Sequence, residues 1–203
     1  MKRVQILTQA SGPHYIGAWE IEPLSICDDI IHNFETKNRS NQAPGNAGEG
    51  EVNLAQKNSR DVSIAPRDFD SAGNEIFVSY LQILTTCYQD YADQWPFLKE
   101  AIPSLDIGVF NIQRYEAGQH FNKVHTERCL TNMEREFAFM TYLNDVEDGG
   151  STYFCHYDIQ IQPKKGLTMI WPAMWTHAHK GNVVQSGKKY IITGWMDLCQ
   201  EIA

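Results

Sequence analysis

Hydrophobic residues recur at helical spacing in two stretches of the first half of the chain. In residues 24–37 the apolar positions are Cys27, Ile30, Ile31 and Phe34. They fall on one face of a helix with 3.6 residues per turn. Residues 74–93 carry a broader apolar stripe, from Ile76 to Tyr91. We therefore predict two amphipathic helices, and we expect the second to pack against a sheet.

Residues 1–22 and 38–60 lack this helical period. In the first segment, Val4, Ile6 and the run from Tyr15 to Ile21 are candidates for short strands. Residues 38–60 are rich in Asn, Gly, Ser and Gln, which favours a loop. A loop of this length is either a lid over a binding site or a disordered segment. The sequence DVSIAP that follows it predicts a short strand.

After Pro103 the pattern changes to short apolar runs and alternating positions separated by turn residues. The predicted strands cover residues 107–115, 136–144, 151–154, 158–163, 167–171, 176–179 and 188–195. Many short strands at regular spacing indicate a β-barrel or β-sandwich. We predict a mainly β, α+β fold in a single domain, with a helical buttress and loop in residues 1–103 and a β-roll in residues 104–203.

Composition and charge narrow the classes of partner and compartment. The net charge of −8 makes the chain poorly suited to nucleic acid or to an anionic membrane. Its five cysteines are widely spread without a CxxC pair, which fits a reduced cytosol. The N-terminus is not a signal peptide, and the longest apolar run, Phe137 to Leu143, is too short to span a bilayer. We expect a cytoplasmic protein, and the sequence does not indicate its oligomeric state.

The short motif His125-Thr126-Glu127 is the main candidate for chemistry. On a strand, residues i and i+2 point to the same side, so the imidazole and the carboxylate would face one point. With one more histidine they would form the two-histidine, one-carboxylate triad of non-haem Fe(II) oxygenases. His156, His177 and His179 are candidates for that ligand, and spacing alone does not choose among them.

Longer motifs around this pair carry a family resemblance. They read QRYEAGQHFNKVHTE, then REFAFMTYLNDVEDGGSTYF, then IQPKKGLTMIWPAMWTHAHKGNVVQSGKKYIITGW. From Ile112 to Trp195 the chain resembles the 2-oxoglutarate- and Fe(II)-dependent oxygenases of the prolyl 4-hydroxylase-like group. The resemblance implies a double-stranded β-helix (jelly-roll) core. It also implies that His125, Glu127 and His179 are the iron ligands.

The same resemblance implies a pocket for the cosubstrate. Lys189 would pair with the distal carboxylate of 2-oxoglutarate, and the hydroxyl of Tyr142 would share that carboxylate. Tyr115 and Thr193 would also line the pocket. The residues themselves agree in part, because Lys189, Thr193 and Trp195 share one strand face by period two. A buried dicarboxylate needs such a cation and such hydroxyl donors.

Two features depart from the usual pattern of the group. Glu127 stands where the group most often has Asp, and its side chain is one methylene longer. His177 adds a second imidazole two residues before His179, and we expect it to lie outside the metal site.

The implied cofactors are Fe(II), 2-oxoglutarate as cosubstrate and O2, with ascorbate as an optional addition. The implied reaction is hydroxylation of an unactivated C–H bond, since an intact carboxylate at Glu127 argues against halogenation. We expect a peptide or protein substrate hydroxylated on a residue such as proline, with a free amino acid or other small molecule as the alternative. A non-catalytic cupin-like binding module and a zinc hydrolase using the same three ligands are alternatives from other classes.

Overall fold

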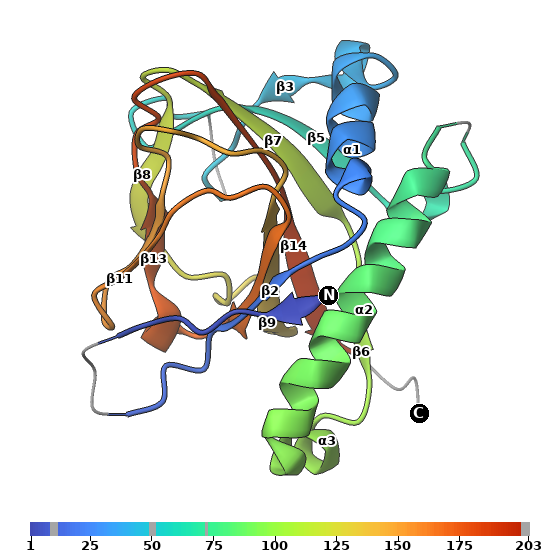
Figure 1. Cartoon of the computed structure of the whole chain (residues 1–203), viewed down its shortest axis with the longest axis vertical. Helices are drawn as coiled ribbons and strands as arrows, with labels where there is room; N and C mark the ends of the chain where they lie inside the picture. Colours follow the sequence, from blue (N-terminus) through green and yellow to red (C-terminus); the bar gives the residue numbers. More distant parts are fainter. Residues whose placement is uncertain (9–11, 49–51, 72, 200–203) are drawn as a thin grey trace.

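The computed structural model describes residues 1–8, 12–48, 52–71 and 73–199, and all structural statements below concern these residues. They form two antiparallel sheets and a few helices (Figure 1). The larger sheet has the order β1 (Lys2–Arg3), β2 (Gly17–Glu20), β12 (Leu167–Pro172), β9 (Arg135–Tyr142), β14 (Lys188–Leu198), β7 (Phe110–Glu116), β5 (Arg60–Ile64) and β3 (Ala43–Pro44), with β6 (Leu105–Asp106) paired to β14. The smaller sheet has the order β11 (Ile159–Ile161), β10 (Thr152–Phe154), β13 (His179–Gly181), β8 (His120–His125) and β4 (Lys57–Asn58).

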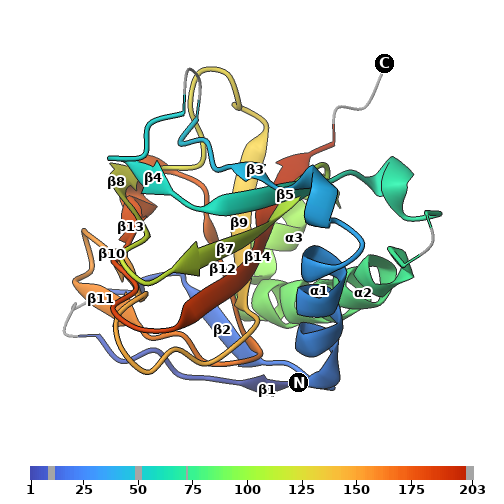
Figure 2. The same ribbon diagram turned by 90° about the horizontal axis from the view of Figure 1, so that it is seen from above.

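The helices are α1 (Ser25–Glu35), α2 (Glu75–Gln94) and α3 (Pro96–Ala101), together with the 3-10 turns η1 (Arg39–Asn41), η2 (Pro66–Asp68) and η3 (Trp175–His177). Helices α1, α2 and α3 lie on one side of the larger sheet, and the smaller sheet lies on its other side (Figures 1 and 2). The molecule thus has three layers, with the larger sheet in the middle. No helix among the described residues combines the length and apolar character needed to cross a bilayer.

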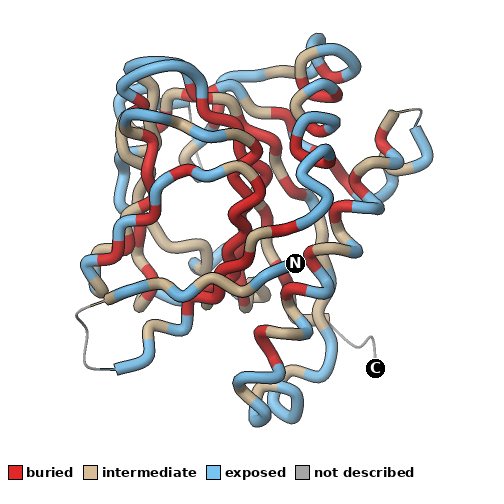
Figure 3. The backbone as a smooth tube through the Cα atoms, in the orientation of Figure 1, coloured by how far each residue is buried: buried red, intermediate tan, exposed pale blue. Residues whose placement is uncertain are grey.

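The central strands of the larger sheet are buried on both faces (Figure 3). One hydrophobic cluster fills the space toward the helices and includes Phe77 of α2, Phe110 and Phe139. A second cluster includes Met169, Trp171 and Phe154, and so joins the larger sheet to the smaller one. Because both faces of β9 and β12 are covered, these strands read as continuous apolar runs rather than as alternating ones.

The two predicted helices are confirmed as α1 and α2. A buried chain of hydroxyl groups fixes α2 on the sheet: Tyr80 Oη lies 2.8 Å from Thr141 Oγ1, which lies 2.7 Å from Thr168 Oγ1. The prediction that the helix of residues 74–93 packs against a sheet is therefore confirmed.

Most predicted strands after Pro103 are present, but the strand predicted over residues 176–179 is wrong. The Ala178 N–H donates to the Trp175 carbonyl and closes the turn η3, so only His179 begins a strand. In residues 38–60 the prediction of a continuous loop is also wrong where β3 and β4 pair with β5 and β8. Within residues 1–22 the strands are β1 and β2. Strand β2 covers only part of the Tyr15 to Ile21 run, and Val4 and Ile6 lie outside strands. The first 103 residues thus contribute strands to both sheets as well as helices.

Candidate metal centre

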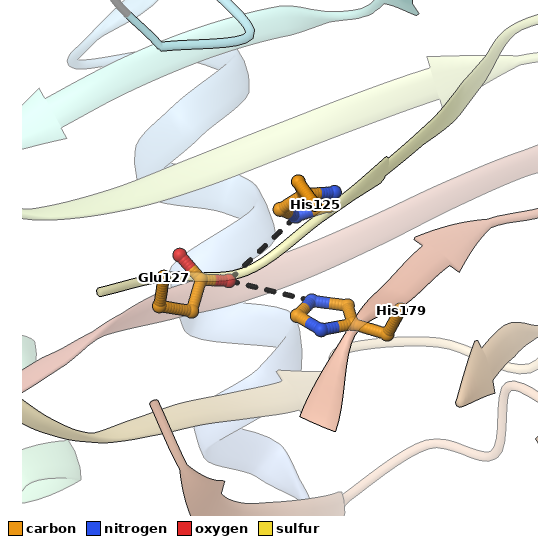
Figure 4. Close-up of side chains that lie close together, drawn as sticks. All are labelled: His125, Glu127 and His179. Atoms are coloured by element: carbon orange, nitrogen blue, oxygen red, sulfur yellow. Dashed lines mark ion pairs between the residues drawn. The ribbon is translucent and has the colours of Figure 1, made fainter. Parts of the chain in front are cut away.

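Three side chains with metal-binding atoms converge at one end of the smaller sheet (Figure 4). His125 is the last residue of β8, and the antiparallel register places His179, the first residue of β13, opposite it. Glu127 Oε1 lies 3.3 Å from His179 Nε2 and 3.7 Å from His125 Nε2. Donor atoms of the three residues all lie within 4.8 Å of one another.

Glu127 reaches this point by a route that differs from the sequence prediction. Strand β8 ends at His125, so Thr126 and Glu127 lie beyond it. Thr126 still turns away from the site, and its hydroxyl donates to the Ala173 carbonyl at 2.7 Å. Glu127 nevertheless faces the same point as His125, with Oε1 3.7 Å from His125 Nε2.

The two imidazoles are oriented by backbone carbonyls. His125 Nδ1 lies 2.9 Å from the Lys123 carbonyl, and His179 Nδ1 lies 2.9 Å from the His177 carbonyl. A carbonyl oxygen only accepts, so each Nδ1 carries a proton, and each Nε2 is the ring nitrogen that faces Glu127. Such a bond from the outer nitrogen is the usual way in which proteins orient metal-binding histidines.

Burial and mutual charge set the protonation of the site. Burial, with a contribution from His179, lowers the pKa of His125 to about 4. For Glu127, burial alone would raise the pKa, but hydrogen bonding to His179 and the nearby imidazoles lower it to about 2. At neutral pH His125 is therefore neutral and Glu127 is ionised, which are the states that bind a metal.

The residues fit a metal ion. Two ligand atoms at about 2.1 Å from a metal and at right angles to each other are about 3 Å apart, close to the separations seen at Glu127. Two imidazoles and one carboxylate on one face, with positions left open, are the donor set of non-haem Fe(II) oxygenases. Within the described ranges, this is the one group of three His, Cys, Asp or Glu side chains that comes this close.

The other two candidate histidines lie elsewhere. His177 is buried and directs Nε2 to the His14 carbonyl at 2.9 Å, while its Nδ1 contacts the Thr176 hydroxyl. His156 packs edge-on against Trp175. Of the three candidates that spacing left open, the structure therefore brings only His179 to His125 and Glu127.

A cavity of about 1020 Å³ between the sheets opens onto these three residues. Tyr115, Lys189, Thr193 and Trp195 also line it. The predicted shared face of Lys189, Thr193 and Trp195 on β14 is thus confirmed. Asn122 and Arg128, which flank the motif in the sequence, do not line it, whereas Lys123 does.

Lys189 is a buried cation without a carboxylate partner among the described residues. The residue is only 3% exposed, and its Nζ donates to the Gly150 carbonyl at 2.9 Å. The amine also lies 4.5 Å from the centre of the Tyr115 ring. Burial lowers the pKa of Lys189 to about 7. An anion in the cavity would supply the missing countercharge.

Tyr142, Tyr115 and Thr193 contribute in different ways. Tyr142 is not among the residues that line the cavity; its hydroxyl lies 2.6 Å from Thr152 Oγ1, and Thr152 does line it. The Tyr115 hydroxyl donates to Gln113 Oε1 at 2.7 Å. Thr193 Oγ1 donates to the Phe139 carbonyl at 2.9 Å, so its hydroxyl hydrogen is already used.

The cavity wall contains an ion pair that was not predicted from the sequence. Lys57 Nζ lies 2.6 Å from Asp61 Oδ2, and both side chains are largely buried. Lys57 and Asp61 lie before Ile112, outside the motifs that carry the family resemblance, and for this reason they were not predicted. Opposite charges four residues apart were the available signal, but that spacing suggests a helix rather than two strands.

Comparison with known proteins agrees with this geometry. Residues 110–197 match the profile of the 2OG-Fe(II) oxygenase superfamily. A curated relative, "Probable prolyl 4-hydroxylase 9" of Arabidopsis thaliana, is 29% identical over 122 residues, which are 47% of this chain and 42% of that protein. The matched part thus spans less than half of that relative.

Several solved structures share the fold. A viral collagen prolyl hydroxylase from Paramecium bursaria Chlorella virus-1 superposes with a TM-score of 0.66 at 19% identity, over 91% of this chain and 97% of that one. A Pseudomonas putida prolyl 4-hydroxylase gives 0.68 at 14% identity, over 92% and 94%. A Trichoplax adhaerens prolyl hydroxylase, solved with a hypoxia-inducible factor peptide, gives 0.71 at 13% identity, over 91% and 84%. Residues 110–197 are therefore similar to the 2OG-Fe(II) oxygenase superfamily, and the chain resembles the prolyl 4-hydroxylase-like group within that family.

Proposed function

We propose that this protein is a hydroxylase that uses Fe(II), 2-oxoglutarate and O2. The observation that carries the proposal is the cavity itself, which holds a two-histidine, one-carboxylate triad and a buried lysine that has no carboxylate partner among the described residues. A zinc hydrolase has no use for that lysine, and a metal-free binding module has no use for the triad. We also infer that the two facing sheets form the jelly-roll typical of this family.

In this proposal His125, Glu127 and His179 hold the metal and leave its remaining coordination positions to cosubstrate and O2. Fe(II) with 2-oxoglutarate and O2 supplies the oxidising power that inserts oxygen into an unactivated C–H bond. The protein's part is to orient the groups and to exclude water. The apolar rings of Phe121, which stacks on His125, and of Trp171, which packs on His179, serve that second purpose.

Lys189 then binds the distal carboxylate of 2-oxoglutarate. A charge-assisted hydrogen bond of this kind is roughly twice as strong as a neutral one. Tyr115 packs its ring on the amine and restricts where it points. Burial raises the pKa of Tyr142, so that its hydroxyl stays protonated, and we assign it the role of supporting Thr152 beside the carboxylate.

The substrate we propose is a peptidyl residue, with proline as the first choice. The names of the relatives support it: each compared protein is a prolyl hydroxylase, and the Trichoplax protein was solved with a peptide. The size of the cavity also supports it, since small-molecule sites span about 300–1,000 Å³ and this cavity, at about 1020 Å³, is slightly larger than that range.

Succinate release tests the proposal. The enzyme, loaded with Fe(II), is given 2-oxoglutarate and either a panel of proline-containing peptides or a panel of free amino acids. We expect peptide-dependent succinate, and none from His125→Ala. Turnover with free amino acids alone would contradict the peptide substrate, and an absence of 2-oxoglutarate consumption under all conditions would favour a non-catalytic module or a hydrolase.

A further inference from the structure

The two carboxylate oxygens of Glu127 have different partners. Oε1 faces the Nε2 atoms of His125 and His179. Oε2 accepts a hydrogen bond from Trp195 Nε1 at 2.7 Å. The carboxylate is therefore held by its outer oxygen and presents its inner one to the proposed metal.

Trp195 is itself firmly placed. It lies in β14, the strand that pairs with β9 on one side and with β7 and β6 on the other, and it is opposite Ala138 of β9. The guanidinium carbon of Arg135 lies 3.5 Å from the centre of a Trp195 ring. Arg135 Nη1 also donates to the Glu127 carbonyl at 3.1 Å. Arg135 and Trp195 thus fix Glu127 at its backbone and at its carboxylate.

The contacts of Glu127 with Arg135 and Trp195 restrict a side chain that its length makes more mobile. Glutamate has one more rotatable bond than the aspartate more common at this position, so its carboxylate has more orientations to lose. Because Glu127 lies beyond the end of β8, the strand ladder does not restrict it either. A free carboxylate could also bind a metal through both oxygens and occupy a position needed by another ligand.

We propose that Trp195 is a positioning residue that makes Glu127 a one-oxygen metal ligand. By holding Oε2, the indole N–H leaves Oε1 alone to bind and selects one orientation of the longer side chain. The inference rests on the metal site proposed above.

Cobalt affinity of the metal-free protein, without 2-oxoglutarate, tests this role independently of activity. Trp195→Phe keeps an aromatic ring under Arg135 but removes the donor. We expect it to weaken Co(II) binding about 10-fold or more, the usual effect of losing a group that orients a ligand. Trp175→Phe is the matched control, because that indole is exposed and packs on His156, outside the group formed by His125, Glu127 and His179. Its Co(II) affinity should stay near that of the wild type.

A second measurement uses only the wild type and so does not depend on a variant that folds. The assigned indole N–H resonance of Trp195 should exchange slowly with solvent and shift when Zn(II) binds, more than the resonance of Trp175. Equal Co(II) affinities for Trp195→Phe and wild type, or a Trp195 resonance that ignores Zn(II), would overturn the positioning role alone. Absence of Co(II) binding in the wild type, or binding unaffected by His179→Ala, would instead overturn the metal site.

Discussion

At the scale of single residues, Lys189 is the least ordinary feature of the cavity. A lysine amine that is buried, bonded to one carbonyl and stacked near one ring is held at a cost in free energy. A bound carboxylate offsets this cost, because it takes the place of water as the partner of the charged amine. Lys189 therefore links binding of an anion to uptake of a proton.

The affinity for 2-oxoglutarate should accordingly fall as pH rises above 7. In the free protein burial lowers the pKa of Lys189 to about 7, and pairing with a carboxylate raises it again in the complex. Below pH 7 the amine is charged in both states, so the affinity is flat. Above pH 7 the free amine is neutral and must take up a proton to bind, so Kd increases by up to about tenfold per pH unit.

Calorimetric titration with Mn(II) in place of Fe(II) measures this dependence. Lys189→Arg is the control, because a guanidinium stays charged throughout the range and should give a flat profile above pH 7. A wild-type profile as flat as that of Lys189→Arg would show that Lys189 does not titrate on binding.

Residue roles were predictable from the sequence only where a motif surrounded them. His125 and Glu127 share a short motif, but the choice among His156, His177 and His179 needed either a family resemblance or the register of β8 with β13. His177 points away from the site because η3 turns it toward the His14 carbonyl, whereas His179 begins β13 opposite His125. Two residues of spacing carry no information about such a turn.

At the scale of elements, the site depends on a crossing between the two sheets. Strand β4 belongs to the smaller sheet and β5 to the larger one, with Ser59 between them. The ion pair of Lys57 and Asp61 joins the two strands, and the Ser59 hydroxyl donates to Asp61 Oδ1 at 2.7 Å. Lys57 also lies 5.1 Å from the ring centre of Phe121, which stacks on His125.

Asp61→Asn should therefore destabilise the fold by about 3 kcal/mol, since it leaves a buried charge without its partner. The substitution keeps the shape of the side chain and removes only its charge. Denaturant unfolding of the metal-free protein measures the change in free energy. Asp70→Asn alters an exposed aspartate that forms no ion pair with any described residue, so the free energy of unfolding of this variant should change little. Equal effects of the two substitutions would mean that the Lys57–Asp61 pair contributes nothing net.

Helices α1 and α2 were predictable from the helical spacing of their apolar residues, and most strands after Pro103 from short apolar or alternating runs between turn residues. The edge strands β3 and β4 were not, because each is only two residues long and pairs with a distant segment. Their sequence is rich in Asn and Gly, which favours loops locally. The pairing of β3 with β5 and of β4 with β8 overrides that local preference for a loop.

At the scale of the whole molecule, the helices, the larger sheet and the smaller sheet form three layers, and the cavity lies between the two sheets. Helices α1 and α2 cover one face of the larger sheet, and the other face forms one wall of the cavity. The smaller sheet closes the cavity and carries two of the proposed metal ligands at its β8–β13 pair. Periodicity predicted a β-roll with helices on it, but the presence of the ligands and of Lys189 in one cavity depends on how the sheets face each other.

The visible spectrum of the anaerobic protein tests the central claim most directly. Fe(II) and 2-oxoglutarate added to the metal-free protein should give a weak charge-transfer band, because in the proposed site His125, Glu127 and His179 would hold Fe(II) and 2-oxoglutarate would bind to the iron. His125→Ala and His179→Ala should lose the band, while Lys189→Ala should need more 2-oxoglutarate to produce it. A wild type without the band, or a band that persists in both histidine variants, would contradict the proposed site.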